Sequence, residues 1–207
     1  MLNMIKTRFL WFCRVLNYTL NSLVFELPRG IDFSMRDKNA NQEYSLNGYA
    51  MTSRRALVNI LSKLDIKSKK ILDIGGGKGA VVYHAYKLGA KFALGIEYSQ
   101  RLHEIALKNF RILNCYDSCT SLNIDAREFS DYGDYDVYFL FNPFDDYVYY
   151  EVMMIIKRQI KSVSRVRWII AYGKSNKDAI MQLDNCHVFH QGTCPYRNTN
   201  YSIYRIN

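Results

Sequence analysis

The sequence predicts a single α/β domain built on a seven-stranded, mostly parallel sheet that ends in an antiparallel hairpin. From residue 69 onward, short apolar runs alternate with segments whose apolar residues recur at helical spacing. Of the 207 residues, 49% are apolar and 23% are charged, which is the balance of a globular protein. The last two apolar runs have no helix between them, which favours an antiparallel hairpin at one edge of the sheet.

The chain is divided into an N-terminal helical cap, residues 1–47, and the α/β domain, residues 48–207. Apolar residues in the first 27 positions recur at helical spacing, with basic residues at the N-terminal end of that segment. We expect a helix packed on the domain, and the alternative is an interfacial helix that makes peripheral membrane contact. Residues 28–48 are polar and contain Pro28, Gly30 and Gly48, which indicates a loop or a flap.

The elements of the α/β domain follow from the change of period along the chain. Thr52 precedes an apolar stripe and predicts a helix over residues 53–64. Short apolar runs that end in turn residues predict the strands, and helical spacing between them predicts the remaining helices. The expected strands are residues 69–75, 91–97, 121–125, 135–142, 166–173, 186–191 and 201–206, and the expected helices are residues 79–88, 100–113, 145–161 and 176–183.

The charge is large and unevenly distributed. The chain carries a net charge of +9 and a calculated pI near 9.3. Residues 1–70 and 157–207 are strongly basic, whereas residues 71–156 carry more acidic than basic side chains. A chain this basic is attracted to polyanions such as nucleic acid or an anionic membrane surface, without the charge identifying the partner.

The cysteines and the hydropathy predict a cytoplasmic protein. Five cysteines occur without a CxxC pair, and no secretory signal or apolar stretch of membrane-spanning length is visible. Membrane association through residues 1–27 is the alternative. Cys186, His187, His190 and Cys194 have metal-binding side chains, but adjacent residues of a strand point to opposite faces, so we expect no metal site.

A glycine-rich loop follows the first expected strand. Residues 73–79 read Asp-Ile-Gly-Gly-Gly-Lys-Gly, and the glycines allow a sharp strand-to-helix turn and close approach of a ligand to the backbone. Gly75, Gly77 and Gly79 match GxGxG, while Gly75, Gly77 and Ala80 match the GxGxxA form of dinucleotide sites. Because the loop alone fits both forms, it does not identify the ligand.

Three acidic residues near the ends of neighbouring strands limit which ligand the glycine-rich loop can bind. Asp73 would repel a pyrophosphate but suits a ligand with an ammonium group, and Glu97 lies where an acid can bind both ribose hydroxyls. Asp125 could accept a hydrogen bond from an adenine amino group, or it could simply cap the following turn. A ligand with an ammonium group, a ribose and an adenine but no phosphate is S-adenosylmethionine. A dehydrogenase would instead bind NADH and not S-adenosylmethionine.

The motifs ILDIGGGKG (71–79), LGIEYS (94–99), NIDARE (123–128) and FLFNPF (139–144) resemble those of class I S-adenosylmethionine-dependent methyltransferases, whose fold is Rossmann-like. The match runs from about residue 48 to residue 172. The resemblance implies that the cofactor-binding residues are Asp73, Gly75, Gly77, Gly79, Glu97, Tyr98, Asp125, Ala126 and Asn142.

The triplet Asn142-Pro143-Phe144 resembles the Asn/Asp-Pro-Pro-aromatic signature of amino methyltransferases, with Phe144 in place of the second proline. As catalytic residues, Asn142 Oδ1 and the Pro143 carbonyl would hold the N–H groups of an acceptor, and Phe144 would lie against the transferred positive charge. Tyr49, Phe144 and Tyr147 are the expected substrate-binding residues. An alternative is that the triplet only ends a strand or shapes the pocket.

The sequence therefore predicts an S-adenosylmethionine-dependent methyltransferase of a small-molecule or glycan acceptor, with nitrogen favoured as the target atom. Small stand-alone bacterial methyltransferases with an NPF triplet are similar in length and motif. A nucleic-acid or protein N-methyltransferase is the alternative, which the charge and Asn142 permit. A nucleotide-binding module without catalysis is the alternative from a different class.

Overall fold

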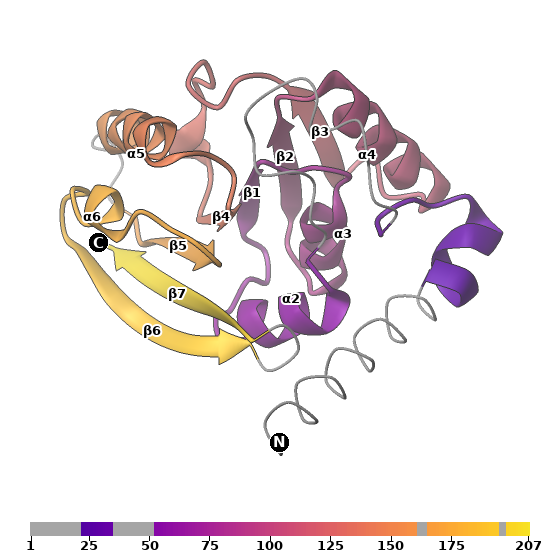
Figure 1. The fold of residues 1–207 in the computed structure, drawn as a ribbon, viewed down its shortest axis with the longest axis horizontal. Helices are drawn as coiled ribbons and strands as arrows, with labels where there is room; N and C mark the ends of the chain where they lie inside the picture. Colours follow the sequence, from indigo (N-terminus) through magenta and orange to yellow (C-terminus); the bar gives the residue numbers. More distant parts are fainter. Residues whose placement is uncertain (1–21, 35–51, 161–164, 195–197) are drawn as a thin grey trace, which may run out of the picture.

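The computed structural model describes residues 22–34, 52–160, 165–194 and 198–207, and contains one seven-stranded sheet in the order β3-β2-β1-β4-β5-β7-β6 (Figure 1). Its strands are β1 (Lys70–Ile74), β2 (Phe92–Glu97), β3 (Cys119–Asn123), β4 (Val137–Phe141), β5 (Arg167–Tyr172), β6 (Cys186–Cys194) and β7 (Thr199–Ile206). Strands β1 to β5 pair in parallel, and β7 pairs antiparallel with both β5 and β6. The predicted fold class, with its C-terminal hairpin, is confirmed.

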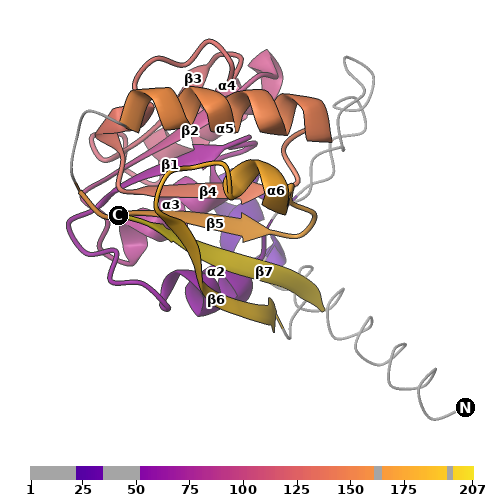
Figure 2. The same cartoon turned by 90° about the vertical axis from the view of Figure 1, so that its left-hand side faces the viewer.

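Helices cover both faces of the sheet, as Figure 2 shows most clearly for α5. The α-helices are α2 (Arg54–Leu61), α3 (Ala80–Lys87), α4 (Gln100–Ile112), α5 (Asp146–Ile160) and α6 (Lys177–Ile180), and the shorter turns are η1 (Ser22–Glu26), η2 (Leu27–Arg29) and η3 (Tyr132–Asp134). One core cluster contains residues of α2, α3 and α4, and the other contains residues of α5 and α6. The sheet is therefore the middle layer of three.

The central strands are buried on both faces, as continuous apolar runs predict. In β1 and β4, neighbouring side chains alternate between the two clusters: Ile71 lies in the first, and Leu72 and Ile74 lie in the second. Asp73 interrupts the apolar sequence of β1 although it is itself buried. A carboxylate in such a position is costly, which marks the carboxyl end of β1 as a candidate for function.

Side-chain caps begin three of the helices. The Ser53 hydroxyl accepts a hydrogen bond from Ala56 N, Ser99 caps α4 in the same way, and the Asn176 side chain accepts from Ala179 N. These caps satisfy backbone N–H groups that have no partner within a helix. The sequence predicted the cap of the first of these helices at Thr52, one residue before the actual cap, Ser53.

Some boundaries differ from the predicted ones. Strand β3 begins two residues earlier than expected and ends at Asn123, so Asp125 lies beyond the strand. Helix α6 ends at Ile180, not at residue 183, because the chain reverses through Asn185, at a φ of 55°, to enter β6. Strand β6 continues to Cys194, since it pairs with β7 along that whole length.

Parts of the predicted N-terminal cap lie outside the described residues. Within residues 22–34 the chain forms the turns η1 and η2, and Ile31 and Phe33 pack against Ala80. Residues 1–21 of the helix predicted over residues 1–27, and the predicted substrate residue Tyr49, lie outside the described residues. In the part of the chain that the structure describes, no helix is long and apolar enough to cross a membrane.

Candidate active site

The glycine-rich loop joins the end of β1 to the start of α3. Gly75, Gly77 and Gly79 have φ values of 80°, 52° and 85°, in the left-handed region that side chains disfavour. Gly79 also faces the Phe110 ring, which a Cβ at that position would overlap. The three glycines of the predicted GxGxG pattern are therefore required by the backbone path itself.

Close packing brings this loop against two neighbouring strands. A Cβ added at Gly76 would lie 2.8 Å from the Cα of Gly95 in β2. A Cβ added at Gly75 would lie 2.9 Å from the Cβ of Pro143, just beyond β4. The glycine loop and the Asn-Pro-Phe triplet, 63 residues or more apart in the sequence, thus lie side by side, as a common site at the carboxyl ends of the strands requires.

Glu97 ends β2 and is held by two backbone donors. Its Oε2 accepts a hydrogen bond from Gly77 N at 2.8 Å, and its Oε1 accepts one from Ser99 N at 2.9 Å. Burial raises the pKa of Glu97, and the hydrogen bonds from these backbone N–H groups lower it in part. Each carboxylate oxygen retains a further lone pair, so the oriented carboxylate can still bind a pair of ribose hydroxyls.

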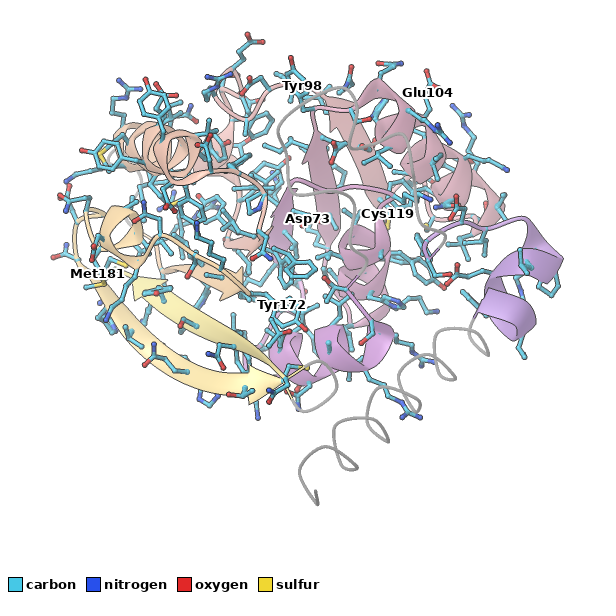
Figure 3. The ribbon with its side chains drawn as sticks, in the orientation of Figure 1. Asp73, Tyr98, Glu104, Cys119, Tyr172 and Met181 are labelled. Carbon is cyan, nitrogen blue, oxygen red and sulfur yellow. The ribbon has the colours of Figure 1, made fainter. Side chains whose placement is uncertain are left out.

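The Asp73 carboxyl is close enough to the Glu97 carboxylate for the two to repel each other. Asp73 is 3% exposed and pairs in register with Gly95 of β2. Figure 3 labels Asp73 beside the central strands. Burial raises the pKa of the Asp73 carboxyl well above its ordinary value, and the Glu97 carboxylate raises it further. Two acids that repel each other across a buried site would be stabilised by a ligand cation, such as the ammonium group of an amino acid.

The loop after β3 is fixed by polar contacts. Arg127 Nη2 donates to Asp125 Oδ2 at 2.6 Å and Arg127 Nε donates to Asp125 Oδ1 at 3.0 Å, so the carboxylate is bound in a forked ion pair. The Arg127 guanidinium holds the pKa of Asp125 below its usual range. Asp125 therefore stays ionised and stabilises the turn, while its remaining lone pairs leave the predicted contact with adenine open.

Two buried tyrosines form hydrogen bonds that hold the backbone of the same loop. Tyr132 donates its hydroxyl hydrogen to the Ala126 carbonyl at 2.7 Å, and Tyr138 of β4 donates to the Tyr132 carbonyl at 2.7 Å. Both hydroxyls are in the core, where an unmet hydrogen bond would be costly. These two tyrosines therefore fix the backbone of the predicted adenine loop.

The Asn142-Pro143-Phe144 triplet leaves β4 through a backbone turn. Asn142 has a φ of 46°, and its carboxamide lies against Gly173, where an added Cβ would overlap Asn142 Oδ1. Phe144 packs against the second core cluster, with its ring edge-on to Tyr149 at a centroid distance of 6.3 Å. Gly173 was missed in the sequence, although a glycine directly after an apolar strand is the available signal.

The two tyrosines proposed at the margin of the site are exposed. Tyr98 is 42% exposed at the end of β2, and Tyr147 is 69% exposed at the start of α5 (Figure 3 labels Tyr98). Exposed rings beside a cofactor site can contact an incoming ligand, but their contacts with cofactor or substrate remain predictions.

Asn123 is a further residue that the sequence did not identify. Its Nδ2 donates to the Glu97 carbonyl at 2.9 Å and to the Tyr98 carbonyl at 2.8 Å. It therefore ties the end of β3 to the end of β2 next to Glu97, the predicted ribose-binding residue. Among the described residues, no group of three or more His, Cys, Asp or Glu side chains is arranged to hold a metal ion.

The sequence has relatives whose descriptions bear on this site. Residues 50–205 match the family described as conserved hypothetical protein 95. A ribosomal protein L11 methyltransferase of Deinococcus radiodurans is 39% identical over 64 residues, which are 31% of this chain and 23% of that relative. The chain therefore matches less than a quarter of the length of that relative.

Solved structures share the fold at low sequence identity. An RNA methyltransferase of Salinibacter ruber in complex with S-adenosylhomocysteine has a TM-score of 0.61 and 16% identity, covering 76% of this chain and 94% of that one. Magnesium protoporphyrin IX methyltransferase of Synechocystis with bound S-adenosylmethionine has a TM-score of 0.59 and 12% identity, covering 94% and 97%.

The described residues fit that cofactor. The glycine loop packs closely against Pro143, Glu97 is oriented by two N–H donors, and Asp73 is a buried acid that a cation would stabilise. The chain belongs to the family described as conserved hypothetical protein 95, and its fold is that of the S-adenosylmethionine-dependent methyltransferases to which it is similar.

Proposed function

We propose that this protein is an S-adenosylmethionine-dependent methyltransferase that transfers a methyl group to a nitrogen atom of RNA. The sequence favoured a small-molecule or glycan acceptor, with a nucleic-acid or protein acceptor as the alternative. The relatives support that alternative, because one is described as an RNA methyltransferase and another as a ribosomal protein methyltransferase. Of RNA and ribosomal protein as acceptors, a surface feature of this chain favours RNA.

That feature is a basic surface, which we call the lysine patch: Lys63, Lys67, Lys69, Lys87 and Lys91. Three of these residues come from the loop after α2, Lys87 is the last residue of α3, and Lys91 directly precedes β2. Ser68 N donates to Gly89 O and Lys91 N donates to Lys69 O, which places the two segments side by side. Asp65 is the acid within this loop, and it accepts a hydrogen bond from Lys67 N.

None of the five lysines forms an ion pair with any residue that the structure describes. Other basic residues, such as Arg127, Lys157 and Lys174, are each within 4 Å of a carboxylate. Clustered positive charge without internal counter-charges attracts a polyanion, and phosphate contacts provide most of the affinity in nucleic-acid binding. The lysine patch is the observation on which the RNA acceptor rests.

The position of the patch sets the size of the acceptor. It lies at the amino ends of β1 and β2, whereas the glycine loop and Glu97 lie at their carboxyl ends. A strand of six residues is about 20 Å long, so an acceptor that contacts both ends must extend over at least that distance. A folded RNA meets this condition, whereas a small molecule does not.

The residues near Pro143 suit a nitrogen acceptor. Bound S-adenosylmethionine supplies a methyl group on a cationic sulfur, and methyl transfer requires the acceptor lone pair to be in line with that bond. In this proposal Asn142 Oδ1 and the Pro143 carbonyl accept the N–H groups of an exocyclic amine, which directs its lone pair toward the methyl group. Phe144 lies beside the positive charge that develops on the acceptor before it loses a proton.

Salt dependence of RNA binding tests the patch. In Lys67→Gln/Lys87→Gln/Lys91→Gln, we expect the slope of log affinity against log salt to fall in magnitude by about two to three, since each lost phosphate contact removes about 0.7 to 0.9. The matched control is Lys108→Gln/Arg158→Gln/Lys177→Gln, which lowers the net charge equally at exposed positions elsewhere. Equal slopes for the two variants would contradict the proposal.

A protein acceptor is the second candidate, because the 39% identity is to an enzyme named for a ribosomal protein. Incubating purified chain with radiolabelled S-adenosylmethionine and ribosomal subunits separates the two. We expect label that resists protease and is released by ribonuclease. Label in protein would establish the second candidate, and no labelling of RNA or protein together with no release of S-adenosylhomocysteine would indicate a module without catalysis.

A further inference from the structure

The glycine loop is joined to the N-terminal segment by an ion pair whose lysine is buried and whose aspartate is partly exposed. Lys78, between Gly77 and Gly79, is 2% exposed, and its Nζ lies 2.7 Å from Asp32 Oδ2. A buried ammonium group is costly unless a charged partner compensates it. The lysine is therefore not a surface residue of the loop, and its partner comes from a segment 46 residues earlier.

Asn109 of α4 connects the same two segments through their backbones. This side chain is fully buried; its Oδ1 accepts from Asp32 N at 2.9 Å, and its Nδ2 donates to the Asp32 carbonyl at 2.9 Å and to the Lys78 carbonyl at 3.0 Å. One side chain thus fixes the backbone position of the loop relative to residue 32.

Glu26 shapes the N-terminal segment into a rigid unit. It is 1% exposed, and its Oε2 accepts from Phe33 N at 3.2 Å, from Ser34 N at 2.9 Å and from Ser34 Oγ at 2.7 Å. Ile31 N also donates to the Glu26 carbonyl at 3.0 Å. The segment therefore has internal hydrogen bonds in addition to its contacts with the loop.

An apolar contact completes the attachment. The Phe33 ring stacks on the ring of Tyr83 in α3 with a centroid distance of 5.7 Å, and its centroid lies 6.3 Å from that of the His84 ring. Burial, with the nearby Arg54, lowers the pKa of His84 to about 4, so the ring is neutral near pH 7 and belongs to the apolar surface. The segment is thus fixed to the first turn of the helix that begins at the glycine loop.

We propose that residues 26–34 form a clasp on the cofactor loop, with Lys78 and Asp32 as positioning residues for S-adenosylmethionine binding. A loop with three glycines at positive φ has many alternative conformations, and selecting the binding-competent one costs entropy. The clasp selects it before the cofactor arrives, since Lys78 directly follows Gly77, whose N–H orients Glu97. The inference depends on cofactor binding and not on the RNA acceptor.

Calorimetric titration of the full chain with S-adenosylmethionine tests the clasp. Asp32→Asn leaves the Lys78 charge without a carboxylate partner from this pair, and we expect about tenfold weaker binding. Lys78→Met should give a similar loss, whereas Lys78→Arg retains the charge and should recover most of the affinity. Leu183→Ala, a buried change in the second core cluster, is the control for lost stability alone.

Comparing cofactor affinity with Tm in the same variants separates a positioning role of Asp32 from a general loss of stability. A positioning role predicts weaker binding in Asp32→Asn and near wild-type binding in Leu183→Ala at equal loss of Tm. Equal affinity in Asp32→Asn and wild type, or equal losses in Asp32→Asn and Leu183→Ala, would overturn the clasp. If Asp32→Asn does not fold, Ser34→Ala removes one donor to Glu26, and two- to fivefold weaker binding is expected. A wild-type chain without affinity would instead refute the cofactor assignment.

Discussion

Asp73 shows how a single residue can be unfavourable for folding and favourable for function. It interrupts the apolar sequence of β1, and both its burial and the neighbouring Glu97 raise its pKa. Residues of this kind occur at functional sites, where a ligand stabilises the charge that the fold does not. At the residue scale, the candidate site is thus marked by a charge in an apolar strand.

Replacing Asp73 by Asn should stabilise the protein without cofactor at neutral pH. The pKa of Asp73 is higher in the folded state than in the unfolded state. The wild type therefore loses stability as the pH rises from about 3.9 through the folded-state pKa, and it does not regain this stability at higher pH. Thermal unfolding of Asp73→Asn and wild type from pH 3.5 to pH 8 tests this. We expect the Tm difference to grow with pH, and a variant less stable than wild type at every pH would contradict it.

The same change should weaken cofactor binding. The neutral amide of the Asp73→Asn variant cannot supply the negative charge that an ammonium group requires, and in the wild type protonation of Asp73 should have the same effect. We expect S-adenosylmethionine affinity of the wild type to fall as pH is lowered through the raised Asp73 pKa. Affinity measurements in Asp73→Asn should show a flatter pH profile, and parallel profiles would exclude this role.

Gly75 provides a test of the close contact between the loop and the triplet. Alanine at this position would combine a φ of 80° with a Cβ 2.9 Å from Pro143. We expect Gly75→Ala to lower turnover by at least tenfold, because it displaces either the loop or the Pro143 carbonyl. Gly133→Ala, in η3, is a control glycine whose φ is not positive. Equal turnover in both variants would argue against the contact.

At the scale of elements, the strands and most helices were predictable because burial on both faces leaves a distinct apolar run. Asp73 and Glu97 lie near the carboxyl ends of two strands that are adjacent and parallel, so their proximity could be predicted from the sequence. The partners Lys78–Asp32 and Tyr132–Ala126 were not predictable, because they join segments through side chains that no local pattern specifies. The end of β3 before Asp125 depends likewise on tertiary contacts.

Helix α2 should contribute to stability mainly through its buried face. Leu57 is fully buried among residues of the first core cluster. We expect Leu57→Ala to lower the free energy of unfolding by about 2–5 kcal/mol, from lost apolar contact and the remaining cavity. Chemical denaturation measures this, with the exposed Val58→Ala as control. A loss below about 1 kcal/mol would mean that α2 does not pack as described.

At the scale of the whole molecule, the two ends of the parallel strands have different characters. The carboxyl ends carry Asp73 and Glu97, and the amino ends carry the lysine patch. The net charge of +9 anticipated a polyanion, but the sequence alone could not tell which lysines lack ion pairs. The fold therefore combines an acidic candidate cofactor site with a distant basic surface, which is the arrangement expected for the proposed large anionic acceptor.

The most direct test of the central assignment is calorimetric titration of S-adenosylmethionine into wild type and Glu97→Gln. Glu97 is oriented by Gly77 N and Ser99 N toward the proposed ribose position, and the amide cannot accept all of the same hydrogen bonds. We predict saturable one-to-one binding to the wild type and at least tenfold weaker binding to Glu97→Gln. Equal affinity in the two proteins would contradict the account.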